Sequence, residues 1–185
     1  MIDNPENNIL KNGDLEAIDS LDLSYKKMIA HIPNYKSFHD QKENVITPQN
    51  AYFYNNVSTT HTLPFYTCID EGAISGNHSV FIRTPPDYAF IFFEQDFKDK
   101  SDYSFSAVVR GKTQTFVCIF CYSYHDKTCD AIQLCHFIIP DENLYKLTGN
   151  FTYDPVNRDA YFKVGAWIQR GEVTMDNFVL QKKSQ

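Results

Sequence analysis

The fold class of this protein is indicated most clearly by the segment Ala160-Tyr161-Phe162-Lys163-Val164-Gly165-Ala166-Trp167-Ile168-Gln169. Every second residue from Ala160 to Ile168 is apolar, which is the two-residue period of a β-strand with one buried face. The residues between them put the only Trp of the chain, a Tyr and two long polar side chains on the opposite face. The segment therefore predicts a strand with a core on one side and an aromatic, hydrogen-bonding surface on the other.

Strand-like segments of the same kind recur from residue 72 onward, separated by turn signals such as Pro85-Pro86, Pro140-Asp141 and Arg170-Gly171. The predicted strands are Ser79–Arg83, Tyr88–Phe97, Tyr103–Arg110, Thr115–Tyr124, Ala131–Ile139, Leu144–Tyr153, Ala160–Gln169 and Glu172–Leu180. Helices do not alternate with them, so a doubly wound parallel sheet is not expected. The sequence predicts one all-β domain over residues 1–185, an antiparallel β-sandwich of the jelly-roll type.

The N-terminal third follows a different pattern. Ile9–Glu16 resembles a short strand broken by Asn12-Gly13, and residues 15–32 have apolar spacing compatible with a helix that Pro33 stops. Residues 33–66 are polar and irregular, with several aromatic residues. We therefore expect a long, partly helical insertion at about residues 20–66, too short for a core of its own.

Composition narrows the classes of function. Aromatic residues make up 15% of the 185 residues, and the formal net charge is −6. Phosphate contacts need clustered Lys and Arg, so nucleic-acid binding is not expected. No apolar run reaches the roughly 18 residues of a membrane span. No signal peptide is visible at the N-terminus, which predicts a protein that folds in the cytoplasm or has lost its leader.

The five cysteines are an odd number, which favours a reducing compartment or one free thiol. The spacing Cys118-x-x-Cys121 suggests zinc or redox chemistry. However, it falls within a predicted strand, where residues three apart point to opposite faces and do not readily share one tetrahedral ion. Small buried apolar side chains are the better interpretation.

The outward face of the 160–169 strand is the candidate binding surface. Trp167 and Tyr161 are expected to stack on sugar rings, because aligned exposed aromatics with neighbouring polar groups form sugar platforms. Hydrogen bonds to hydroxyls are expected from Lys163, Gln169, Arg110 and Gln133, if their strands share a sheet. Tyr122 and Tyr124 join this face only if Val117, Ile119 and Cys121 form the core face of their strand, which the sequence leaves open. The alternative is that Trp167 packs beneath the insertion.

Five short motifs lie in a fixed order along the chain. Asn8–Glu16 (NILKNGDLE) comes first, Ser75–Val80 (SGNHSV), Asp102–Ser106 (DYSFS) and Leu147–Thr152 (LTGNFT) follow, and Gly171–Leu180 (GEVTMDNFVL) comes last. In this order they resemble the motifs of calcium-stabilised jelly-roll carbohydrate-binding modules, the kind attached to xylanases and cellulases. The resemblance covers nearly the whole chain apart from the insertion. It implies non-catalytic binding of a glycan or polysaccharide.

The resemblance also implies a structural calcium ion that joins the first strand to the last. The matching ligands are the carboxylates of Glu16 and Asp176 and main-chain carbonyls near Gly13 and Asn77. Calcium takes six to eight such oxygens. The alternative is that the two carboxylates simply accept hydrogen bonds from turn amides.

Two other functions compete with glycan binding. One is a protein-interaction or scaffold module that contacts a protein partner through the aromatic-rich residues 33–66. The other is an enzyme, but the sequence contains no nucleophile elbow and no Gly-rich phosphate loop. We therefore expect a protein that is not an enzyme.

Overall fold

The computed structural model describes residues 5–20, 46–55, 66–69, 71–83, 88–97, 99–125, 128–154 and 161–184. Within these ranges it consists of strands and turns, without a helix. The short strands are β1 (Ile18–Ser20), β2 (Ile46–Pro48), β3 (Tyr52–Asn55), β4 (Tyr66–Ile69) and β5 (Ser79–Arg83). The longer strands are β6 (Tyr88–Gln95), β7 (Ser101–Gly111), β8 (Phe116–His125), β9 (Thr128–Ile138), β10 (Tyr145–Tyr153), β11 (Tyr161–Gln169) and β12 (Glu172–Lys182).

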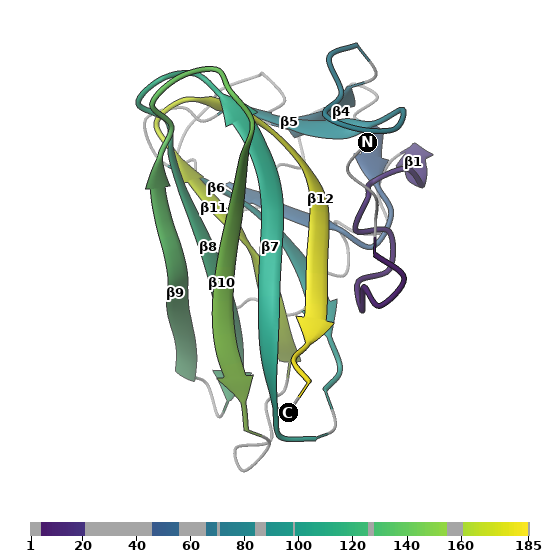
Figure 1. Cartoon of the computed structure of the whole chain (residues 1–185), viewed down its shortest axis with the longest axis vertical. Helices are drawn as coiled ribbons and strands as arrows, with labels where there is room; N and C mark the ends of the chain where they lie inside the picture. Colours follow the sequence, from purple (N-terminus) through teal and green to yellow (C-terminus); the bar gives the residue numbers. More distant parts are fainter. Residues whose placement is uncertain are drawn as a thin grey trace.

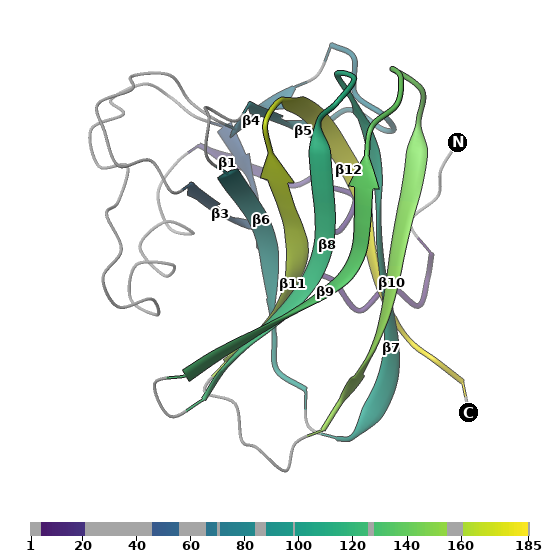
Figure 2. The same cartoon turned by 90° about the vertical axis from the view of Figure 1, so that its left-hand side faces the viewer.

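Ten of these strands form two five-stranded sheets that face each other (Figure 1; Figure 2). One, which we call the β12 sheet, has the order β10-β7-β12-β5-β4, and the other, the β11 sheet, has the order β3-β6-β11-β8-β9. β1 and β2 form a separate small pair. Every described pairing is antiparallel, so the predicted antiparallel β-sandwich is confirmed.

The eight predicted strands all exist, with ends that shift by a few residues. The prediction for the N-terminal third is partly wrong. Residues 5–17 form turns rather than a strand, and Ile18–Ser20 is a strand where a helix was expected to have begun. Ile46–Pro48 and Tyr52–Asn55 are strands within the region expected to be irregular. The rest of the predicted helix and insertion, residues 21–45 and 56–65, lies outside the described residues.

The core lies between the two sheets and is built on large rings from both. Phe93 of β6 has its ring centroid 5.0 Å from that of Phe178 of β12, which in turn lies 6.3 Å from Phe105 of β7. All three side chains are at most 1% exposed. Toward the other end, Phe97 stacks on Tyr103 at 4.2 Å and lies 5.3 Å from Phe162 of β11. These contacts between sheets bury the apolar area that stabilises the sandwich.

A β-bulge in β12 changes which residues face the core. Val173 and Met175 face inward before it, and Phe178 and Leu180 face inward after it, so the inward positions change from odd to even. The register shift falls between Asp176 and Val179, and Asn177 has a φ of 46°. A bulge adds one residue to a strand and re-aims the side chains beside it. Here Asp176 turns toward Ser75, in the turn before β5, and toward Ser79, the first residue of β5.

The described residues contain no helix of the length and apolarity that a membrane crossing requires.

Candidate functional site

The alternation predicted for β11 is present. Phe162, Val164, Ala166 and Ile168 all lie in the core. Lys163, Gly165, Trp167 and Gln169 therefore occupy the opposite, outer face of the β11 sheet. Ala160 lies outside the described residues, as does the side chain of Tyr161.

The orientation of β8, which the sequence left open, is now determined. Val117, Ile119 and Cys121 belong to the core, so Phe116, Cys118, Phe120 and Tyr122 share the outer face with Trp167. In the register of the sheet, Trp167 lies opposite Cys118 and Lys163 lies opposite Tyr122. Tyr124 is opposite Tyr161, but neither of these two side chains is among the described ones.

Aromatic rings from three adjacent strands meet on this outer face. We call the set formed by Phe90, Phe92, Phe116, Phe120 and Trp167 the aromatic face. The Trp167 ring stacks beside Phe90 at 6.1 Å and meets Phe116 edge-on at 5.8 Å, and Phe120 meets Phe90 edge-on at 5.5 Å. Such pairs stabilise one another beyond the area that they bury.

The rings of the aromatic face differ in exposure. Phe92 and Phe120 are only 4% and 6% exposed, whereas Phe90, Phe116 and Trp167 are half-buried. Between Phe92 and Phe120 lies Gly165, where a Cβ atom would be 2.2 Å from the carbonyl oxygen of Ile91 and 2.7 Å from the Cβ atom of Phe92. Glycine therefore allows β6 and β11 to approach closely beneath the rings.

Lys163 has a different environment from the one predicted. It was expected at the surface, but it is 2% exposed. Its Nζ atom lies 4.2 Å from the centre of the Phe92 ring and 3.5 Å from Oε1 of Glu94. Burial lowers the pKa of Lys163 from 10.5 to about 8, and the neighbouring Glu94 carboxylate opposes that change. The physical reason for the difference is that the Lys163 ammonium group packs over the Phe92 ring beside Glu94 instead of extending to solvent.

Arg110 does not belong to this face. β7 lies in the β12 sheet, and Arg110 pairs with Thr174 of β12 on the other side of the sandwich. Its guanidinium group donates a hydrogen bond to the carbonyl oxygen of Gly72. Arg110 was expected on this face only if its strand shares a sheet with Trp167, and that condition is not met. Strand alternation does not reveal which strands share a sheet.

The other predicted polar residues do share the β11 sheet. Gln169 is half-buried and pairs with Phe116, and the exposed Gln133 of β9 pairs with Phe120. Tyr122 is half-buried. The sheet thus brings together Trp167, Lys163, Gln169, Gln133 and Tyr122, with Lys163 beneath the surface.

Sequence reasoning missed the contribution of β6 and part of β8. Phe90, Phe92 and Glu94 alternate with the core residues Ala89, Ile91 and Phe93. The signal was present in the segment YAFIFFEQ, but it is apolar on both faces, so its alternation is hidden. His136 was also given little weight; it is exposed, and its ring lies 5.6 Å from that of Phe116.

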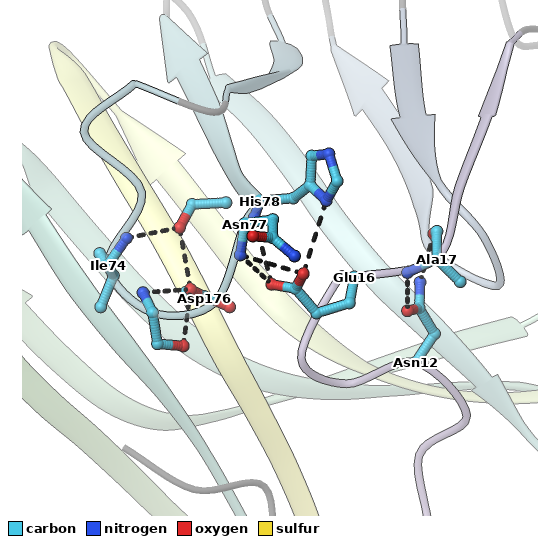
Figure 3. A network of polar contacts seen from close by, with 9 residues as sticks. Asn12, Glu16, Ala17, Ile74, Asn77, His78 and Asp176 are labelled. Atoms are coloured by element: carbon cyan, nitrogen blue, oxygen red, sulfur yellow. Dashed lines mark hydrogen bonds and ion pairs between the residues drawn. The ribbon is translucent and has the colours of Figure 1, made fainter. Parts of the chain in front are cut away.

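The two carboxylates of the expected calcium site are held by the same turn (Figure 3). Glu16 accepts hydrogen bonds from the backbone amides of Asn77 and His78 at 2.9–3.1 Å. Asp176 is fully buried and accepts four, from the Ser75 amide and hydroxyl, the Ser79 hydroxyl and the Asn177 amide. Burial raises the pKa of Asp176 above its ordinary value, and these hydrogen bonds oppose the rise.

The other two expected ligands lie at the same junction. The Gly13 carbonyl oxygen accepts a hydrogen bond from the Phe178 amide at 2.7 Å, and the backbone amide of Asn77 donates a hydrogen bond to Glu16. Within the described part of the chain, no three His, Cys, Asp or Glu side chains form a group that could hold a metal ion. The groups that contact these two carboxylates are N–H and O–H donors, which suit a carboxylate and compete with a cation for its oxygens. The calcium site stays a prediction.

The cysteines of β8 face opposite ways, as their spacing predicts. Cys121 lies in the core and Cys118 lies beneath the outer face, and both are buried free thiols. Burial raises the pKa of Cys118 to about 11 and that of Cys121 to about 12. Both groups are therefore thiols rather than thiolates at neutral pH, which suits packing rather than metal or redox chemistry.

Comparison by sequence finds no protein-family model that matches the chain and no matching curated protein. Comparison by structure finds several matches. The CBM22-1 xylan-binding domain from Paenibacillus barcinonensis Xyn10C aligns with a TM-score of 0.59 at 11% identity, over 74% of this chain and 88% of that one. The CBM22-2 xylan-binding domain of the same protein aligns with a TM-score of 0.60 at 7% identity, over 73% and 92%.

A further match is TmCBM61, in complex with β-1,4-galactotriose. It has a TM-score of 0.54 at 8% identity, over 73% of this chain and 90% of that one. Identities this low are informative about the fold rather than the ligand. The resemblance seen in the ordered motifs is confirmed at that level: the chain has the jelly-roll fold of carbohydrate-binding modules.

Proposed function

We propose that this protein is a non-catalytic carbohydrate-binding module whose ligand lies against the aromatic face of the β11 sheet. The observation that carries the proposal is the meeting of half-buried rings from three neighbouring strands, Phe90, Phe116 and Trp167. Such rings offer the C–H faces of a pyranose an apolar surface. The fold supports the same function, because solved modules with this architecture are xylan-binding domains by name.

Hydrogen-bonding side chains lie on the same face of the sheet. Tyr122, Gln169 and Gln133 come from β8, β11 and β9, and each pairs directly with a residue of that outer face. In this proposal they bind sugar hydroxyls, while Trp167 and Phe116 provide the stacking surface. Tyr161 and Tyr124 pair with each other farther along β11 and β8, and their part in binding stays a prediction. Lys163 supports the platform from beneath, since it is buried.

A ligand held by a few half-exposed rings and amides is expected to bind weakly, with a Kd in the micromolar to millimolar range, on the order of −4 to −8 kcal/mol. The first ligands to test are soluble xylan and β-1,4-linked galacto-oligosaccharides, which the similar modules bind by name.

A glycan array followed by titration calorimetry tests the proposal, with Trp167→Ala as the variant and Asn150→Ala as the control. Asn150 is exposed on β10 in the other sheet. We expect binding that Trp167→Ala weakens at least tenfold and that Asn150→Ala leaves unchanged. Equal binding by both variants would move the site away from the aromatic face. No binding to any glycan would favour the alternative, a protein-interaction module that uses residues 33–66.

A further inference from the structure

The junction between the N-terminal segment and β12 is closed by hydrogen bonds around two carboxylates, Glu16 and Asp176. These carboxylates occupy the positions where the jelly-roll resemblance implies calcium. We infer that this chain holds the junction without a metal ion. The inference does not depend on glycan binding, because the junction involves neither the aromatic face nor any of its neighbours in the β11 sheet.

Asp176 is surrounded by hydrogen-bond donors that compete with a cation for its oxygens. Its Oδ2 atom accepts from the Ser75 amide at 3.0 Å, the Ser75 hydroxyl at 3.2 Å and the Ser79 hydroxyl at 2.8 Å. Its Oδ1 atom accepts from the Asn177 amide at 2.6 Å. A carboxylate offers about four lone-pair directions, and four donors already surround this one, three of them at Oδ2 and one at Oδ1.

Glu16 is held in the same way. Oε1 accepts from the amides of Asn77 and His78, Oε2 accepts from the Asn77 amide, and His78 Nδ1 lies 3.6 Å from Oε2. These amides point their partial positive charges at the carboxylate and take the place that a bound cation would fill.

The turn that provides the amides is adapted to this role at Gly76. This residue has a φ of 57°, and a Cβ atom there would lie 2.1 Å from Oε1 of Glu16. Any other residue would push the carboxylate away from the Asn77 amide. The glycine therefore serves the direct contact between the turn and Glu16.

Further hydrogen bonds, which involve neither Glu16 nor Asp176, connect the N-terminal segment to β12. The Asn8 side chain donates to the Phe178 carbonyl and accepts from the Leu180 amide, both at 2.9 Å. The Ile9 amide donates to the Leu180 carbonyl at 2.8 Å. These contacts continue the backbone pairing of β12, and the buried Leu10 and Leu15 pack beneath them.

One side-chain acceptor at the junction is buried without a hydrogen-bond donor among the described residues, the Oδ1 atom of Asn177. It is a single neutral oxygen. Calcium requires six to eight oxygen ligands at 2.3–2.6 Å, so this atom does not make a site.

Thermal unfolding of the EDTA-treated protein, measured in excess calcium chloride and in excess EDTA, tests the inference. We expect the two Tm values to agree within about 1 °C. A structural site saturated at a hundredfold over its Kd would raise the Tm by roughly 5–10 °C in a chain of this size. A rise of that size that disappears in Asp176→Asn would overturn the inference. A rise that Asp176→Asn retains would place calcium elsewhere and leave the inference intact.

A second pair of variants separates the two arrangements even if Asp176→Asn does not fold. Ser79→Ala removes a hydroxyl that donates to Asp176, and Ser104→Ala removes a half-buried hydroxyl from the outer face of β7 as a control. We expect Ser79→Ala to lower the Tm equally in calcium and in EDTA, and Ser104→Ala to change it little. A Ser79→Ala protein whose Tm is restored by calcium would contradict the inference.

Discussion

Lys163 provides a direct test of the burial that the structure assigns to the outer face. The perturbation is the double substitution Lys163→Met/Glu94→Gln, which removes both charges of the pair and keeps similar volumes. Lowering the pKa of Lys163 from 10.5 to about 8 by burial corresponds to roughly 3 kcal/mol. This is the free energy by which folding favours the neutral amine over the ammonium form.

The direction of the pH dependence follows from this shift. Because the pKa is lower in the folded state, the unfolded chain binds more protons between about pH 8 and pH 10.5. The contribution of Lys163 to stability is therefore fully present above pH 10.5 and is lost as the pH falls through about 8. Between pH 7 and pH 9 the wild type is expected to gain about 1 kcal/mol relative to the double variant.

The comparison with a variant is needed because two buried thiols act in the opposite direction. The raised pKa values of Cys118 and Cys121 make the folded state bind more protons above about pH 9, so their contribution is lost as the pH rises. These effects are the same in both proteins and cancel in the difference.

The single variant Lys163→Met leaves the Glu94 carboxylate without its cation. We expect it to cost about 1–3 kcal/mol, less than for a fully buried pair, because the Glu94 side chain is 28% exposed.

Urea unfolding at pH 7 and pH 9 under reducing conditions, followed by the fluorescence of the only Trp, measures this difference. The expected result is a wild-type stability that rises relative to the double variant by about 1 kcal/mol over this range. A difference that stays constant or falls between pH 7 and pH 9 would contradict this prediction, because it would mean that the pKa of Lys163 is not lowered in the folded protein.

Three further predictions concern the core, the junction and the thiols. Phe178→Ala removes a fully buried ring that contacts Phe93 and lies near Phe105. It is expected to lower the free energy of unfolding, measured by chemical denaturation, by about 3–5 kcal/mol. A decrease below about 1 kcal/mol would contradict the packing described. Gly76→Ala is expected to lower the free energy of unfolding by about 1–3 kcal/mol, because it adds both strain at a φ of 57° and a clash with Glu16. Ala73→Gly in the same loop is the control and is expected to lower it far less in the same assay. In the folded protein at pH 8, Cys118 and Cys121 are expected to react with a thiol reagent more slowly than the half-buried Cys135. Peptide mapping that finds Cys121 labelled first would be inconsistent with its burial.

Local sequence patterns were sufficient to predict the strands of the sandwich from Ser79 onward and the inward faces of β7 and β11. Strand alternation is a local property with a period of two residues, so it can be read wherever one face is clearly more apolar than the other. That condition holds for Phe162 to Ile168 and fails for β6 and β8, where both faces are apolar. For this reason the inward face of β8 was left open, and Phe90 and Phe92 were missed.

The arrangement of strands into sheets and the surroundings of each side chain could be learned only from the three-dimensional structure. Arg110 lies on the far side of the sandwich, Tyr122 shares the outer face of the β11 sheet with Trp167, and Lys163 is buried against Phe92 and Glu94. The amides of the 75–79 turn also point at Glu16 and Asp176, residues that lie far apart in the chain. Strand order and burial depend on contacts between distant segments, and the two-residue pattern of a single strand contains no record of its neighbours.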